Sequence, residues 1–377
     1  MSMQKICVLI FSLVILGATE SLASNKLDVA VPVFDPGIPE DYDKWEKENI
    51  YPEVRRSEAR YLALQLAETL TGTGQWGAVR VLPSRDEVIS DIVVYATIVE
   101  STGGSLKLNV FAYDSTGKNL LKKKYKHEVH PRFYTDRTKK GVDPYQKVMA
   151  AIANDLSAKA RKLKDKSVRN IKNTTTLRYG HSLAPEAFGD TLKIKGKKKQ
   201  SWKIKHMPAE NDPMLQRVAM VRLRDDMFTD AMQTTYQNFS GNMAEDYLKW
   251  RQESSIEYHA MKKAKKQATG RILGGILAAA AGVVVAAETK GTYGDAAAVG
   301  LIGAGAVGVA SGVKKNKQAS QYKAMMAEHA KSFDAAIEPQ VVEFEEETAT
   351  LTGTIEEQFV QFRELLARVY HSENAIS

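Results

Sequence analysis

Cysteine is almost absent from this chain of 377 residues, with Cys7 as the one example. Residues 1–23 have the form of a secretory signal peptide: a short basic start, an apolar run over 7–17, and the small residues Ser21 and Ala23 before the expected cleavage point. Cleavage there removes Cys7, so the mature chain would have no thiol for a disulfide, a nucleophile or a metal ligand. The alternative is an uncleaved anchor helix, for which the apolar run is short.

Other catalytic signatures are missing as well. The seven histidines form no H-E-x-x-H or other tight ligand set, which argues against a metal site. No G-x-S-x-G motif occurs, which removes the sequence support for serine hydrolysis. We therefore expect no enzyme activity and no cofactor. An enzyme built on an unrecognised pair of carboxylates stays open as an alternative.

The chain is basic, with a formal net charge of +8 at pH 7. A basic balance favours anionic partners such as acidic lipid, lipopolysaccharide or an acidic protein surface. Export argues against nucleic acid. We expect the protein in the periplasm and associated with the outer membrane, with secretion as the alternative.

Residues 24–165 alternate between strand and helix patterns, which predicts an α/β domain. Residues 27–34 form a β-rich apolar run, and residues 54–70 place apolar side chains on one helix face. Leu106, Leu108 and Val110 alternate as in a half-buried strand. Further strands are expected at 79–82, 92–99 and 120–129, followed by a helix that opens at Asp143–Pro144.

This order of elements resembles the amino-terminal domain of the TolB translocation protein and the related fold in curli-secretion and penicillin-binding-protein activator lipoproteins. The resemblance rests on residues 29–34, 59–70, 91–98 and 106–110 and covers about a third of the chain. It implies a protein-binding module of the cell envelope without catalytic chemistry. Two features of those families, a lipidated cysteine and a following propeller, have no counterpart here.

Residues 166–212 are interpreted as a basic connecting region. Two short arms, 193–195 and 202–205, flank Gly196 and indicate a small hairpin that carries seven lysines over 192–206. A solvated surface ribbon explains this pattern. The alternative is a patch for anionic headgroups, with Lys197, Lys198 and Lys199 as contacts.

Residues 213–377 have helical periodicity. Apolar side chains recur every three or four residues along three stretches, which predicts amphipathic helices. Pro339 and Gly353 are expected to separate the last two helices, and the acidic residues between them are interpreted as a solvated helix face. The stripes are Tyr236, Phe239, Met243, Tyr247 and Trp250; Tyr322, Met326, Ala330, Phe333 and Ile337; and Phe359, Phe362, Leu366 and Val369. The acidic run is Glu343, Glu345, Glu346 and Glu347.

An apolar helical hairpin is predicted at 272–313. Residues 272–287 and 296–313 contain no charge and are joined by a polar turn with two glycines. As helices they would be about 24 and 27 Å long, slightly shorter than the hydrocarbon core of a bilayer, about 30 Å. Small residues recur every fourth position in both, which gives each helix one groove for close packing. These residues are Gly274, Ala278, Gly282 and Ala286 in the first helix and Gly300, Ala304, Gly308 and Gly312 in the second.

The sequence of this hairpin has two alternative interpretations. A hairpin buried in a soluble core could have the same composition. The segment 299–308 also matches G-x-G-x-x-G, the dinucleotide fingerprint, but that site needs a second strand ending in an acidic residue. Lysines and a helical stripe follow instead, so we reject this interpretation.

Lysines flank the hairpin, with Lys265 and Lys266 before it and Lys314 and Lys315 after it. If both ends lay in the periplasm, insertion in the inner membrane would oppose the positive-inside tendency. These residues are therefore predicted contacts for anionic headgroups of the outer membrane.

Together these patterns predict an α+β fold: a signal peptide (1–23), a periplasmic α/β domain (24–165), a basic connecting region (166–212) and a helical domain (213–377) with the hairpin. The expected function is a cell-envelope scaffold that binds an envelope protein, reaches the outer membrane through the hairpin and forms homo-oligomers there. The alternative is a secreted helical pore-forming protein.

Overall fold

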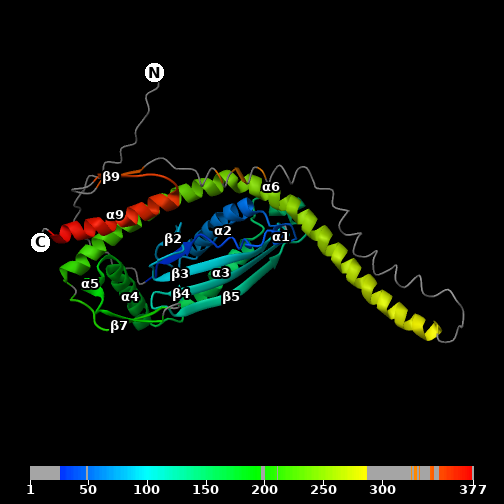
Figure 1. Ribbon diagram of the computed structural model, residues 1–377, viewed down its shortest axis with the longest axis horizontal. Coiled ribbons are helices and arrows are strands. Elements are labelled where there is room, and N and C mark those ends of the chain that lie inside the picture. Colours follow the sequence, from blue (N-terminus) through cyan, green and yellow to red (C-terminus); the bar gives the residue numbers. More distant parts are fainter. Residues whose placement is uncertain are drawn as a thin grey trace, which may run out of the picture.

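The computed structural model describes residues 26–47, 50–196, 200–209, 211–286, 340–343 and 348–375, with Ala324, Ala327, Glu328 and Lys331. A sheet covered by helices forms the body, and one long helix crosses the body and projects beyond it (Figure 1). The fold is α+β, as predicted from the sequence.

The body is built on a five-stranded sheet of order β2-β1-β3-β4-β5. β1 (Val29–Pro32) lies parallel to β2 (Val79–Leu82) and to β3 (Ile92–Ser101). β4 (Ser105–Asp114) and β5 (Asn119–Glu128) continue as an antiparallel meander. All four residues of β1 are buried, as expected for a central parallel strand, whereas alternate residues of β4 are buried. The strands predicted in this region are confirmed.

Two helices pack side by side on one face of the sheet. α2 (Pro52–Gly72) is the crossover between β1 and β2, and α3 (Gln146–Ala160) follows β5. α2 begins with Pro52, whose missing N–H costs nothing at a helix start. Its predicted apolar face is buried. The short helix α1 (Asp43–Lys47) precedes α2.

The longest element is α6 (Pro213–Ala286), a helix of 74 residues. The predicted stripe from Tyr236 to Trp250 is buried throughout. The carboxyl-terminal helix α9 (Ile355–Ala375) packs beside α6, with Phe362 stacked on Phe228 at 3.9 Å between ring centroids. The buried residues of the sheet, α2, α3, α6 and α9 belong to one continuous apolar cluster.

Residues 166–183 form most of a helix that was not predicted. α4 (Asp165–Leu183) contains Thr174, Thr175 and Thr176, and β-branched residues have low helix propensity. Each threonine hydroxyl donates to the carbonyl four residues earlier, so the helix itself satisfies these groups. Thr175 also donates to Asp91 Oδ1 over 2.6 Å. α5 (Pro185–Phe188) and the hairpin β6 (Leu192–Lys195)–β7 (Ser201–Ile204) follow, and that hairpin was predicted.

One local prediction is wrong. The segment between Pro339 and Gly353 contains a second hairpin, β8 (Gln340–Glu343) and β9 (Thr348–Leu351), so Glu343 lies in a strand and not on a helix face. Half of the residues in each arm are β-branched, and pairing between strands outweighed the weak helical pattern. The predicted α9 stripe from Phe359 to Val369 is buried and confirmed.

Several predicted features lie outside the described residues. They are the signal peptide at 1–23, the polar turn and second helix of the apolar hairpin, the stripe residues Tyr322, Met326, Ala330, Phe333 and Ile337, and the acidic residues Glu345, Glu346 and Glu347. Ala324, Ala327, Glu328 and Lys331 are helical.

The turn between β3 and β4 packs tightly against α6. Gly103 has a φ of +67°, and a Cβ atom there would lie 1.9 Å from the carbonyl oxygen of Arg251. Gly104 leaves no room either, because its Cβ would lie 2.3 Å from the ring of Tyr258. Only glycine fits between this turn and the helix.

We predict that Gly103→Ala lowers the free energy of unfolding by about 3 kcal/mol, because positive φ and the clash with α6 add together. Gly74→Ala is the matched control: its φ is +63°, but no atom lies within 4 Å of the added carbon. We expect the control to lower the free energy of unfolding by about 1 kcal/mol. Urea denaturation measures both, and equal losses would contradict the close packing of α6 on the turn.

Candidate functional site

α6 is held on the body by a largely buried ion pair between Arg251 and Asp143, whose side chain keeps 18% of its surface exposed. Arg251 Nη1 donates to Asp143 Oδ1 over 3.2 Å, and Nη2 donates to Oδ2 over 2.9 Å. Only 1% of Arg251 is exposed. Burial disfavours both charges, but their mutual attraction outweighs it, so the pKa of Asp143 is lowered and the pKa of Arg251 is raised. Both groups are therefore ionised.

Three tyrosine rings surround this guanidinium. Its Cζ atom lies 4.0 Å from the ring centroid of Tyr247, 5.1 Å from that of Tyr145 and 5.7 Å from that of Tyr61. Aromatic faces attract cations, most strongly where water is excluded. The Tyr61 hydroxyl donates to Asp143 Oδ2 over 3.1 Å. The rings thus join α2, the start of α3 and α6 around one charge.

Glu58 of α2 lies beside the pair and is fully buried. Its Oε1 accepts from Tyr247 Oη over 2.9 Å and from Ser101 Oγ over 2.7 Å. Arg55 Nε lies 3.6 Å from Oε2. Burial raises the pKa of Glu58, and the charge of Arg55 and the two hydrogen bonds offset only part of this effect. We call Arg251, Asp143, Glu58 and the three tyrosines the Arg251 clamp.

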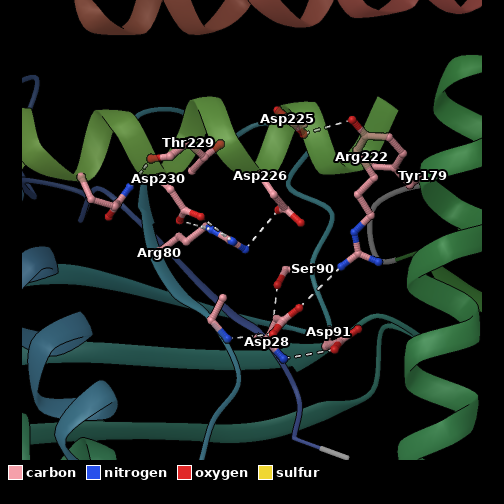
Figure 2. Close-up of polar contacts among 12 residues, drawn as sticks. Asp28, Arg80, Ser90, Asp91, Tyr179, Arg222, Asp225, Asp226, Thr229 and Asp230 are labelled. Atoms are coloured by element: carbon pink, nitrogen blue, oxygen red, sulfur yellow. Dashed lines mark hydrogen bonds and ion pairs between the residues drawn. The ribbon is translucent and has the colours of Figure 1, made fainter. Parts of the chain in front are cut away.

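A second attachment joins the edge of the sheet to an earlier part of α6 (Figure 2). We call it the charged seam; it consists of Asp28 and Arg80 on the sheet side and Arg222, Asp226 and Asp230 on α6. Arg80 Nε donates to Asp230 over 2.6 Å, and Arg80 Nη1 lies 3.1 Å from Asp226. Figure 2 shows Arg222 directed back toward Asp28, at 3.7 Å. The sheet side and α6 thus each carry a basic residue that faces an acidic residue of the other. This arrangement favours one register of helix on sheet.

Gln233 of α6 completes this contact at the sheet edge. Its Oε1 accepts from the N–H of Val81 over 2.8 Å, and its Nε2 donates to the carbonyl of Val81 over 3.0 Å. The side-chain amide therefore takes the place of a neighbouring strand beside β2. Covering an edge in this way protects its backbone groups from pairing with another chain.

A cavity of about 40 Å³ lies within the charged seam. It has space for only a few water molecules, whereas small-molecule pockets measure about 300 Å³ or more. Among the described residues, no group of three or more His, Cys, Asp or Glu is placed to hold a metal. The geometry is that of an ionic contact between elements, with no room for a substrate.

Beyond the Arg251 clamp, α6 continues to Ala286 as a projecting helix (Figure 1). These 35 residues extend about 52 Å. The first set of predicted zipper residues, Gly274, Ala278, Gly282 and Ala286, lies on this helix four residues apart. Lys265 belongs to the same helix, and Lys266 is exposed on it.

The remaining predicted contact residues lie outside the described part of the chain. They are Gly300, Ala304, Gly308, Gly312, Lys314 and Lys315 of the hairpin region and Lys197, Lys198 and Lys199 of the basic ribbon. None of the described helices is both long and apolar enough to cross a membrane. The role of the hairpin in a membrane stays a prediction.

The residues of the Arg251 clamp were not singled out from the sequence. One signal for them exists: Arg251 follows Tyr247 by four residues and so continues the buried face of the stripe. A charged residue on an apolar helix face indicates a buried partner of opposite charge. Its partner, Asp143, is 108 residues away, and helical periodicity cannot identify it.

The chain matches no protein-family model, no curated protein and no solved structure. The resemblance to the TolB amino-terminal domain therefore stays an interpretation of the element order.

We predict that Arg251→Met lowers the free energy of unfolding by about 3 kcal/mol, because the largely buried Asp143 loses its counter-charge. Adding Asp143→Asn should restore part of the lost free energy of unfolding, since the unpaired charge is then removed. A double-mutant cycle from urea denaturation measures the coupling. Arg56→Met is the control, because the pair of Arg56 with Glu53 is exposed and worth less than about 1 kcal/mol. Similar losses for both single variants would contradict the clamp.

The raised pKa of Glu58 predicts a pH dependence. A folded state that holds a proton more tightly than the unfolded state loses stability as pH rises from the unfolded pKa toward the folded pKa. Glu58→Gln keeps an acceptor for Tyr247 and Ser101 and has no proton to lose. We expect this variant to lose less stability than the wild type as pH rises above about 4.5, as measured by thermal unfolding. Parallel pH profiles would show that Glu58 is not perturbed.

Proposed function

We propose that the protein is a non-catalytic scaffold of the cell envelope that presents an apolar helix to the outer membrane. In this proposal the α/β body lies in the periplasm and binds an envelope protein. The segment 272–313 reaches the membrane and brings copies of the chain together.

The observation that carries the proposal is the continuity of α6. The charged seam and the Arg251 clamp hold its first part on the body, and the same helix runs without a break to Ala286. Its last 15 residues, 272–286, contain no charged side chain. A helix that is anchored at one end and uncharged at the other is suited to hold an apolar segment away from the body.

The spacing of small residues supports self-association as part of this role. Glycine inside a helix costs up to about 1 kcal/mol relative to alanine, so the glycines that alternate with alanine in this series need a compensating contact. Close packing of helix backbones supplies such a contact in membranes, where small residues four apart let helices approach.

Membrane flotation of the full chain and of a variant lacking 272–313 tests the anchoring role. We expect the full chain to float with outer-membrane vesicles and the deletion variant to stay in the soluble fraction. An unchanged distribution of the deletion variant would refute the proposal. Dye release from liposomes by the purified full chain would instead favour a pore-forming role.

Substitutions within the helix test self-association. Gly274→Leu with Gly282→Leu fills the small-residue face, whereas Ala280→Leu with Val284→Leu adds bulk about half a turn away. We expect chemical crosslinking in membranes to lose its oligomer bands only with the glycine variants. Loss of the oligomer bands in both double variants, or in neither of them, would contradict packing through the small residues.

A further inference from the structure

A basic loop lies where α6 leaves the body. Residues 129–142, between β5 and α3, carry Arg132, Arg137, Lys139 and Lys140, and all four side chains are exposed. Figure 1 shows that β5 ends on the side of the body from which α6 projects. The contacts that join the ends of this loop to α6 connect residues more than 100 positions apart in sequence, and the sequence pattern did not bring them together.

Contacts at both ends attach this loop to α6. Glu128, directly before the loop, forms an ion pair with Lys262 of α6. Val129 donates its N–H to the carbonyl of Gly104 over 2.9 Å, in the turn that packs against Tyr258. Asp143, directly after the loop, is held by Arg251. The loop is therefore fixed to the helix at the point where the helix projects.

Hydrogen bonds within the loop and to the β3–β4 turn order it. Tyr134 Oη donates to the carbonyl of Gly103 over 2.7 Å. Asp136 caps the short turn that follows it: its Oδ1 accepts from Thr138 N over 2.9 Å and from Thr138 Oγ1 over 2.7 Å. The loop thus presents its cations from a defined backbone, which reduces the entropy lost on binding.

Cations predominate at this site. We call the four basic residues of the loop together with Lys262, Lys263 and Lys266 of α6 the basic collar. Within the described residues, Arg132, Arg137, Lys139 and Lys140 form no ion pair. The loop itself carries one carboxylate, Asp136. Glu128 precedes the loop, and the hydrogen bonds from Lys126 and Lys262 lower its pKa to about 2. Both stay ionised, and the collar keeps a clear excess of positive charge.

We propose that the basic collar docks the body on the anionic headgroups of the membrane that the apolar segment enters. This inference rests on the proposed function and adds the chemistry of the lipid surface. The spacing along α6 supports it: Ile272, the first residue of the apolar segment, follows Lys266 by six residues, about 9 Å of helix. The interfacial layer on each side of a bilayer is about 5–8 Å thick, so the collar would reach the headgroups once the apolar segment is in hydrocarbon.

The contribution of the basic collar to vesicle binding is measurable. Each basic residue close to an anionic surface strengthens binding by about fivefold. Replacing Arg132, Arg137, Lys139 and Lys140 with Gln should therefore weaken binding to anionic vesicles by at least about tenfold, even if some positions contribute little. Binding to neutral vesicles should not change, because that part comes from the apolar segment.

The test compares four purified proteins by vesicle co-sedimentation: the wild type, the collar variant, the deletion of 272–313, and a control variant. The control replaces Lys118, Lys162, Lys164 and Lys166 with Gln; these exposed lysines lie toward the opposite end of the sheet. It removes the same charge as the collar variant. Vesicles of phosphatidylcholine alone and vesicles containing phosphatidylglycerol serve as probes. The proposal expects the collar variant, and not the control variant, to lose its preference for the anionic vesicles.

Equal binding of the collar and control variants to anionic vesicles would overturn the collar and leave the proposed function standing. Suppose that the wild type binds anionic vesicles through the collar and does not bind neutral vesicles. This result would overturn the anchoring role of the apolar segment and support the role of the collar. No binding to either vesicle would overturn both. Tighter collar-dependent binding to a single-stranded oligonucleotide than to anionic vesicles would replace lipid by nucleic acid as the occupant.

Discussion

The direction of α6 depends on one buried ion pair, Arg251 with Asp143. A buried pair of this kind contributes little net stability compared with apolar residues of the same size, but separating the partners is costly. Sliding α6 by one turn would move Arg251 by about 5.4 Å, away from its carboxylate and from the tyrosine rings around it. The glycine turn at Gly103 and Gly104 leaves no space for a different approach. The pair therefore specifies a single register of helix on sheet.

The charged seam gives α6 its second fixed point. Arg222 and Arg251 are 29 residues apart, which corresponds to about 43 Å along the helix. A single attachment would let α6 rotate about that point. Two attachments at this separation fix the direction of the helix axis. α9 adds apolar packing between them through the stacked rings of Phe228 and Phe362. The body thus works as a mount for the projecting helix, and the basic collar lies at the exit of that helix.

Much of the architecture followed from local patterns. Alternation predicted β4, and the stripe from Tyr236 to Trp250 predicted the buried face of α6. Two elements were missed because packing overrode weak local preference: α4 with its three threonines, and the β8–β9 hairpin beside the acidic run. The Arg251 clamp and the basic collar join residues more than 100 positions apart. Such contacts depend on the assembled fold, and hydrophobic period carries no information about them.

The fixed direction of α6 is most directly tested by a distance measurement between spin labels. With Cys7 replaced by Ser, labels at Lys118→Cys in the β4–β5 turn and Lys266→Cys on α6 report the position of the helix relative to the sheet, since both sites are exposed. Pulsed electron paramagnetic resonance should give one narrow distance distribution for the otherwise wild-type chain. A broad or multimodal distribution would contradict a helix fixed by the Arg251 clamp and the charged seam.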